Sequence, residues 1–120
     1  MATNKKFQSM LRRIKKFRDQ RDWMQFHNPK DMAEAISIEA AELLEHFLWK
    51  TPEEAKKYVQ NKNNLKKVAD ELSDIFSFVF ELADNLGVDI EKAFINKLKK
   101  NVKKYPIKKV KGKATKYNRL

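Results

Sequence analysis

The chain has 120 residues, 42% of them hydrophobic, which suits one compact domain with its own core and leaves little room for a second. It contains no Cys, so disulfides and zinc sites built on thiolates are excluded. The net charge of +11 belongs to one segment, because residues 97–120 carry eleven Lys and Arg and no acidic residue, whereas 16 basic and 16 acidic residues balance before it.

The first ten residues, MATNKKFQSM, lack the apolar stretch of a signal peptide. No run in the chain approaches the roughly 20 apolar residues that are needed to span a bilayer. We therefore expect a soluble, cytoplasmic protein without a membrane partner.

Helices are predicted throughout, because apolar residues recur at three- and four-residue spacing and only two Gly and three Pro interrupt the chain. The first helix is expected to end near Arg21, and Pro29 disfavours helix at Asn28. Asp31 and Glu34 have capping-box spacing and predict a second helix that runs to about residue 49. The core candidates on these two helices are Phe7, Met10, Leu11, Ile14, Phe17, Met32, Ile36, Leu43 and Phe47.

Three further helices are predicted. Thr51 and Glu54 indicate the start of a short polar helix over about 52–60, followed by an asparagine-rich break. A long helix, expected to be the least exposed, begins at Leu65 and is stopped by Gly87. Asp89 caps a last helix that ends before residue 106. The apolar residues of the last two helices are Leu65, Val68, Leu72, Ile75, Phe76, Val79, Leu82, Ala83, Leu86, Phe94, Leu98 and Val102.

The stretch after Pro106 has no periodic apolar face. We therefore divide the chain into a helical domain, 1–106, and a basic, extended C-terminal tail, 107–120.

Two acidic pairs interrupt the apolar helices. Glu39 and Glu42 lie on the second helix, and Glu71 and Asp74 lie near the start of the long one. Each pair places two carboxylates on nearly the same helix face, where they repel each other unless a cation bridges them. Oxygen ligands that converge from two helices suit Mg²⁺ or Mn²⁺.

The alternative for each pair is an ordinary solvated helix face, and the pattern alone leaves the two interpretations about equally weighted. A di-iron carboxylate site is a further metal hypothesis, but it requires a Glu-x-x-His step on two helices. His46 follows Glu42 by four residues, and the helix with Glu71 has no His. The di-iron hypothesis is therefore weakly supported.

An ordered series of segments around these pairs resembles the MazG-like all-α nucleoside triphosphate pyrophosphohydrolases, in particular their dCTP pyrophosphatase branch. The matching segments are RDWMQFHNPK at 21–30, the Glu39/Glu42 pair, FLWK at 47–50, DELSD at 70–74, LGVDIEKA at 86–93, NKLKKNVKKYP at 96–106 and KYNRL at 116–120.

The resemblance implies a four- to five-helix bundle that forms an obligate oligomer, a homodimer or a homotetramer. It also implies hydrolysis of a (d)NTP, such as dCTP or a modified nucleotide, between the α- and β-phosphates to give the monophosphate and pyrophosphate. Glu39, Glu42, Glu71 and Asp74 are then the catalytic residues and the Mg²⁺ or Mn²⁺ ligands. One Glu acts as general base, for which we favour Glu42.

The resemblance further implies substrate-binding residues, carried over one position at a time. Trp23 and Trp49 match aromatic positions that pack around the base, and Lys97 and Asn101 match positions that contact the triphosphate and sugar. Phe78 stands where the branch has Tyr, and Ile14 where it has His, which places the preferred base in doubt.

The tail residues of the predicted site are basic and aromatic. Lys116 and Tyr117, with Lys111 and Lys113, resemble a terminal segment that folds over the substrate. The alternative for the tail is a disordered, solvated segment. His27 also follows the family pattern, but a single loop His is more often structural, so we leave it out of the predicted catalytic set.

Two other functions stay open at the level of sequence. A basic helical module without enzymatic activity would bind nucleic acid through the tail and the first helix. This explains the tail but not the acidic pairs, so we do not expect nucleic acid as the main partner. A structural helical oligomer without activity is supported only by the apolar stripes.

Overall fold

A computed structural model describes residues 4–120, and over that range the chain is helical and contains no strand. The all-α prediction is confirmed, and residues 1–3 of the predicted domain lie outside the described residues. The elements in chain order are α1 (Lys5–Gln20), η1 (Met24–Phe26), α2 (Pro29–Glu45), α3 (Pro52–Tyr58), α4 (Lys62–Asn85), α5 (Ile90–Lys104), α6 (Ile107–Val110) and η2 (Tyr117–Arg119).

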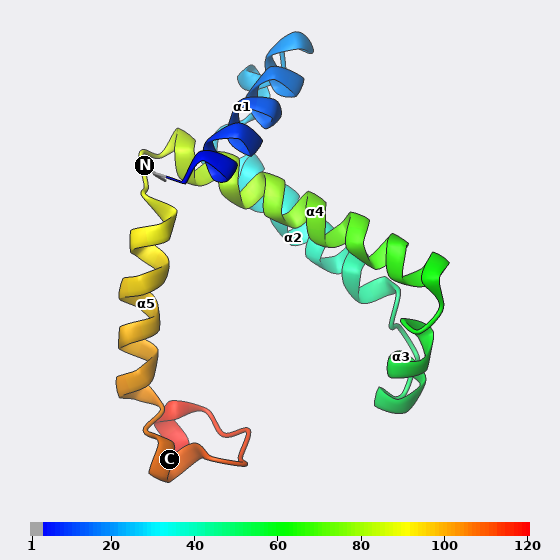
Figure 1. The fold of residues 1–120 in the computed structure, drawn as a ribbon, viewed down its shortest axis with the longest axis vertical. Helices are drawn as coiled ribbons and strands as arrows, with labels where there is room; N and C mark the ends of the chain where they lie inside the picture. The colour runs from blue at the N-terminus through cyan, green and yellow to red at the C-terminus, as the bar shows by residue number, and fades with distance from the viewer. Residues whose placement is uncertain (1–3) are drawn as a thin grey trace.

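The centre of the fold is an antiparallel pair of helices, α2 and α4, with α1 packed across α4 (Figure 1). The short helix α3 lies at one end of this pair, where it joins α2 to α4. At the other end, α5 leaves the pair and extends away from it. The pairing of α2 with α4 matters most for function, because each of these helices carries one of the acidic pairs.

The start of α2 differs from the prediction. Asn28 is the N-cap, and its side chain accepts a hydrogen bond from the backbone N–H of Asp31 at 2.9 Å, while Pro29 occupies the first turn. The helix therefore starts before Asp31, because Asn is a strong N-cap and Pro has the φ value of a first helical residue. It also ends earlier than predicted, at Glu45, and a turn leads to Trp49, whose φ of 64° is incompatible with helix.

The starts of α3 and α4 can also be compared with the predicted ones. The predicted capping box of α3 is confirmed, since Thr51 and Glu54 bond reciprocally at 3.2 and 3.3 Å. The predicted break between the short and the long helix is present, but it covers residues 59–61 rather than the whole of NKNN. Asn61 caps α4 by accepting from the backbone N–H groups of Asn63 and Asn64, so the helix begins at Lys62 rather than at Leu65.

The two signals between α4 and α5 are confirmed. Gly87 follows the C-cap of α4 with a φ of 69°, a left-handed conformation that favours glycine. Asp89 caps α5 by accepting from the backbone N–H of Lys92 at 3.1 Å.

The segment after Pro106 is not extended throughout. The carbonyl of Pro106 accepts backbone hydrogen bonds from Lys109 and Val110, which produces the single turn of α6. Further on, the ring of Tyr117 packs edge-on against Tyr105 with 6.1 Å between the ring centroids, at the start of η2. The prediction of an extended tail is therefore wrong at these two turns, because local bonds and one aromatic contact order them. The division at residue 106 stays a prediction.

The hydrophobic core within one chain is small. Among the described residues, its buried apolar side chains are Met32, Val68, Phe80 and Ala83, three of them on α4. The radius of gyration is 17.6 Å, against about 14 Å for a compact domain of this length. The predicted stripe on α5 is exposed, with Phe94, Leu98 and Val102 62%, 51% and 66% accessible. One chain alone therefore does not bury its apolar helix faces.

Within the described part of the chain, none of the helices combines the length and the apolar character that crossing a membrane requires.

Candidate active site

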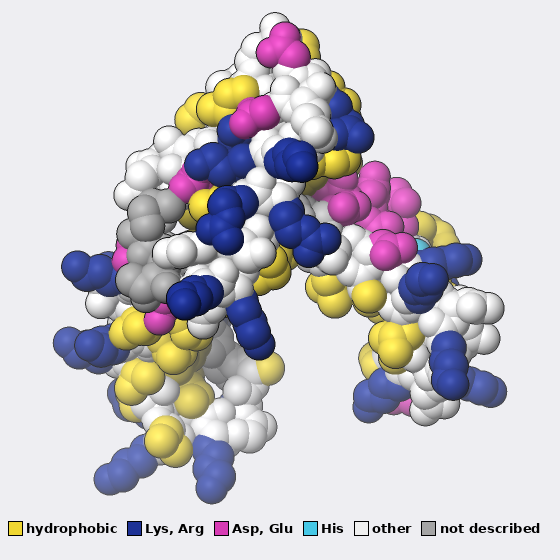
Figure 2. All heavy atoms as spheres, turned by 45° about the horizontal axis from the view of Figure 1, so that its top comes forward, with side chains coloured by type: hydrophobic (Ala, Val, Ile, Leu, Met, Phe, Trp, Pro, Cys, Tyr) yellow, Lys and Arg dark blue, Asp and Glu magenta, His cyan; other side chains and the backbone are white. Residues whose placement is uncertain are grey.

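A cluster of carboxylates lies between α2 and α4. Glu39 and Glu42 come from α2 and Glu71 from α4, and one oxygen of each lies within 4.8 Å of the others. Figure 2 shows acidic side chains gathered on one arm of the molecule, among basic and apolar ones. The antiparallel packing of two helices thus brings together residues that are 32 positions apart in sequence.

Two carboxylate oxygens of this cluster are buried and have no hydrogen-bond partner among the described residues. They are Glu39 Oε2 and Glu71 Oε2. Leaving a carboxylate oxygen buried and unpaired is costly, and a bound cation removes that cost. An all-oxygen donor set suits a hard divalent cation, so the residues of this cluster fit one.

The ionisation of Glu39 reflects the same crowding. Burial, a hydrogen bond with Glu42 and the negative charges of Glu42, Asp74 and Glu71 raise the pKa of Glu39 to about 7. The negative charges of these three neighbours repel a further negative charge on Glu39, and a bound divalent cation would offset that repulsion.

A pH dependence follows from this raised pKa. The ordinary pKa of the Glu39 carboxyl is 4.5, so between 4.5 and about 7 the folded state holds a proton that the unfolded state has lost. Without a divalent cation, this carboxyl lowers the free energy of unfolding progressively as the pH rises through that window. Urea unfolding across the window checks this, with Glu39→Gln as the reference. We expect the difference between wild type and variant to change with pH, and a constant difference would contradict the prediction.

Asp74 lies apart from the other three carboxylates. It is not in the set whose oxygens converge within 4.8 Å, but its charge acts on Glu39 and it lines a neighbouring pocket. Asp74 therefore lines the pocket and lies close enough to Glu39 to affect its ionisation. Its predicted role as a fourth metal ligand stays a prediction.

The pocket beside Asp74 has a volume of about 660 Å³ and lies between α1, the η1 segment and α4. Its apolar lining is Met10, Ile14, Phe17, Trp23, Phe76 and Phe78, and its polar lining is Arg13, Arg18, His27, Ser73, Asp74, Ser77 and Glu81. Trp23 and Phe78, two predicted substrate-binding residues, thus line one cavity. A pocket that combines aromatic side chains with polar and charged ones, close to a carboxylate cluster, suits a planar organic group attached to an anionic chain.

A buried polar network, which the sequence did not predict, supports this pocket. Glu81 is 2% exposed and its Oε2 accepts from His27 Nδ1 at 2.7 Å and from Asn85 Nδ2 at 3.0 Å. Arg18, which is 6% exposed, lies with Nη1 3.5 Å from the same oxygen. Helical periodicity gave no signal for this network, because it places Glu81 on the face of the long helix opposite the predicted apolar stripe. His27 is part of this network rather than of the carboxylate cluster.

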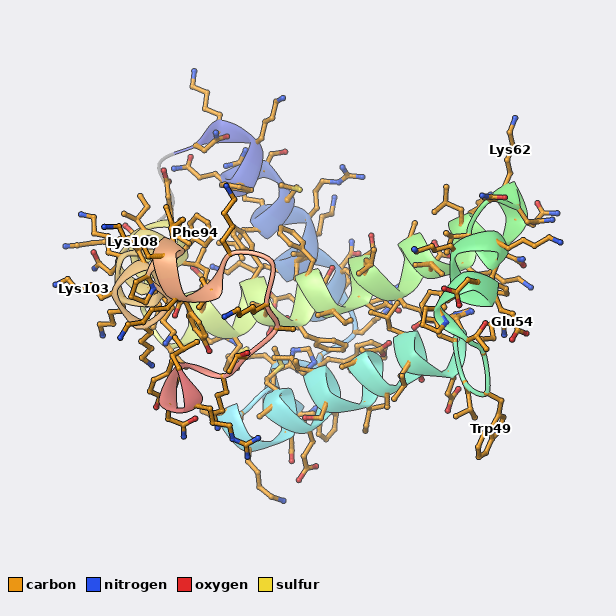
Figure 3. All side chains as sticks on the ribbon, turned by 90° about the horizontal axis from the view of Figure 1, so that it is seen from below. Trp49, Glu54, Lys62, Phe94, Lys103 and Lys108 are labelled. Carbon is orange, nitrogen blue, oxygen red and sulfur yellow. The ribbon has the colours of Figure 1, made fainter. Side chains whose placement is uncertain are left out.

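The remaining predicted substrate-binding residues lie elsewhere in the single chain. Trp49 is 93% exposed and points away from the turn between α2 and α3 (Figure 3). Lys97 and Asn101 lie on α5, which extends away from the α2–α4 pair (Figure 1). Lys116 and Tyr117 lie in the C-terminal segment, where Tyr117 contacts Tyr105. The chain by itself does not bring these five to the carboxylate cluster.

The chain is similar in sequence and in fold to known proteins. The sequence profile of the MazG-like family matches residues 35–120, which include all four predicted metal-binding residues. The chain belongs to the MazG-like family. The family predicted from the ordered segments is thereby confirmed.

Individual relatives and a solved structure are also similar to the chain. It is 36% identical to dCTP pyrophosphatase 1 of Bos taurus and 33% identical to that of Homo sapiens, each over 104 residues, or 87% of this chain. It spans only 62% and 61% of those two proteins. The crystal structure of a pyrophosphatase from Archaeoglobus fulgidus superposes with a TM-score of 0.79 at 32% identity, covering 88% of this chain and 97% of that one. The helical fold of this chain is therefore similar to nearly the whole of the archaeal protein.

Proposed function

We propose that this MazG-like protein is a nucleotide pyrophosphohydrolase that cleaves a (d)NTP, dCTP or a modified nucleotide, to the monophosphate and pyrophosphate. The observation that carries the proposal is the pair of buried, unpaired carboxylate oxygens on Glu39 and Glu71, close to a pocket with aromatic walls. The similarity to dCTP pyrophosphatase 1 supports the choice of substrate. Such an enzyme would limit the entry of its substrate nucleotide into DNA.

Mg²⁺ is the proposed cofactor, with Mn²⁺ as a substitute, held by Glu39, Glu42 and Glu71 and joined by Asp74. When bound, the ion would offset the charge of the triphosphate and lower the pKa of the attacking water. Glu42 is the proposed general base, and its carboxylate takes the proton that the water loses. Glu42 lines the open groove on the α3 side of the cluster, as Glu71 does, so water can reach its carboxylate.

The base is proposed to bind in the pocket lined by Trp23 and Phe78. Trp23 packs edge-on against Phe17 with 5.7 Å between the ring centroids, and the guanidinium of Arg21 lies 3.8 Å from the Phe17 ring centroid. These contacts hold an aromatic wall on one side of the pocket. Asp74, at the pocket lining, then marks the direction in which the triphosphate would run toward the carboxylate cluster.

A homodimer or homotetramer is proposed to complete the site. The exposed stripe of Phe94, Leu98 and Val102 supports this, because a contiguous apolar face of this kind marks an interaction surface. A neighbouring copy is also the proposed source of contacts for Trp49, Lys97, Asn101, Lys116 and Tyr117.

Sedimentation of the purified chain tests the proposed oligomer. We expect an assembly larger than a monomer for the wild type and dissociation for Leu98→Asp, which places a charge in the apolar stripe. Lys100→Asp is the matched control, because Lys100 is exposed on the other side of α5. A monomeric wild type, or equal dissociation of both variants, would contradict the prediction.

The proposed activity is tested by incubating folded protein with Mg²⁺ and a panel of dNTPs, NTPs and modified dCTP analogues. We expect pyrophosphate and the corresponding monophosphate in equal amounts from at least one deoxynucleotide. Absence of pyrophosphate from the whole panel, with the protein folded, overturns the proposal.

A further inference from the structure

His46 connects three helices beside the carboxylate cluster. It is the C-cap of α2, one turn after Glu42. Its Nδ1 lies 2.9 Å from the hydroxyl of Tyr58 at the end of α3, and its Nε2 lies 3.6 Å from Oε1 of Glu71 on α4. The carboxylate that faces this ring is therefore one of the three that converge in the cluster.

The two neighbours of the ring determine which nitrogen carries the proton. Nε2 lies 3.6 Å from Oε1, which is beyond a direct hydrogen bond, and a carboxylate oxygen attracts an N–H rather than a bare ring nitrogen, so this approach favours the tautomer with the hydrogen on Nε2. In the neutral ring Nδ1 is then an acceptor, and the Tyr58 hydroxyl donates to it. The Tyr58 hydroxyl thus selects the tautomer in which His46 presents an N–H to Glu71.

Tyr58 is itself fixed from several sides. Its backbone carbonyl accepts from Asn64 Nδ2 at 3.0 Å, its ring packs edge-on against Phe47, and Lys50 Nζ lies 4.7 Å from the ring centroid. The helix that carries it, α3, has no buried residue of its own. The hydroxyl of Tyr58, which contacts His46 at the end of α2, is therefore the group through which α3 contributes to the site.

The geometry at Glu71 is directional. Oε1 faces His46, while the other oxygen, Oε2, is buried and has no partner among the described residues. Both side chains are largely shielded, with His46 18% and Glu71 20% exposed. An N–H directed at Oε1 from 3.6 Å attracts that oxygen and favours the carboxylate orientation in which Oε2 faces a cation.

We propose that His46 is a positioning residue that orients Glu71 for the cation, with Tyr58 holding its ring in the required tautomer. This inference rests on the proposed function, because it concerns the metal ligand Glu71. His46 is an outer partner and not itself a ligand. Loss of such an outer partner lowers metal affinity or activity by about 10- to 100-fold in metal sites generally.

The test measures Mn²⁺ binding by the whole protein, using electron paramagnetic resonance and no nucleotide. His46→Leu removes the donor at similar size and is expected to weaken Mn²⁺ binding by about tenfold or more. His46→Gln retains an N–H that reaches toward Glu71 and is expected to recover most of that loss. Tyr58→Phe is expected to weaken binding by a smaller factor, and Tyr105→Phe, which removes a remote hydroxyl, is expected to leave it unchanged.

The outcomes separate this inference from the proposed function. Wild-type affinity in His46→Leu, or a ¹⁴N coupling to bound Mn²⁺ that makes His46 a direct ligand, overturns the positioning role alone. A wild-type protein that binds no Mn²⁺ overturns the proposed metal site and the inference with it. If His46→Leu does not fold, Tyr58→Phe decides, since unchanged Mn²⁺ affinity in that variant overturns the role.

Discussion

Replacing Glu42 by Gln is expected to lower the rate of nucleotide hydrolysis by on the order of 10³-fold, the equivalent of about 4 kcal/mol of transition-state stabilisation. The substitution keeps the shape of the side chain but removes both the negative charge and the proposed base. Because the cluster has three converging carboxylates, removal of one also weakens cation binding. Pyrophosphate release at saturating Mg²⁺ measures the effect, and circular dichroism should show helicity near that of the wild type.

Glu34→Gln is the matched control, since it makes the same chemical change on the same helix at an exposed residue whose partner is Lys30. It is expected to retain full activity. Asp74→Asn is informative for another reason, because Asp74 lies outside the converging set. If the bound ion draws Asp74 into its shell, this variant loses activity as Glu42→Gln does. Wild-type activity in Glu42→Gln would contradict the proposed site.

The two acidic pairs could be predicted from the sequence, because helical periodicity places residues three apart on one face. They are Glu39 with Glu42, and Glu71 with Asp74. Their meeting depends on the antiparallel packing of α2 and α4, which spacing along one helix does not specify. That packing converges three of the carboxylates and leaves Asp74 at the pocket.

The helix boundaries show which local signals dominate. Thr51, Gly87 and Asp89 act as predicted, because each satisfies a backbone group at a helix end by itself. Asn28 and Asn61 were underestimated as caps, so α2 and α4 begin earlier than predicted.

The core was harder to predict than the helices. The stripes on α4 and α5 are periodic, yet Leu72, Phe76 and Leu98 are exposed in the single chain. Periodicity identifies the face of a helix that must be covered but not which chain covers it. The pairing of Arg18 with Glu81 was unpredictable for a related reason, because it joins side chains 63 positions apart on helices whose contact is tertiary.

Replacing Glu81 by Ala is expected to lower the free energy of unfolding by about 3–5 kcal/mol. The carboxylate is 2% exposed, and its Oε2 is the common acceptor for His27 and Asn85 beside the guanidinium of Arg18. Its removal leaves the buried positive charge of Arg18 with Asp19, whose side chain is 56% exposed, as its remaining ion-pair partner. Urea unfolding at one fixed protein concentration measures the loss, since any oligomer makes stability depend on concentration.

The comparison that isolates this effect is Glu34→Ala, which breaks an ion pair with Lys30 whose side chains are 57% and 81% exposed. Such a pair contributes at most about 1 kcal/mol, because water solvates both charges when they separate. Replacing Arg18 by Met together with Glu81 by Leu is expected to recover much of the loss, because no uncompensated charge is then buried. A loss for Glu81→Ala no larger than that for Glu34→Ala would show that the network does not hold α1 and the η1 segment against α4. The pocket wall formed by Phe17 and Trp23 would then need another source of rigidity.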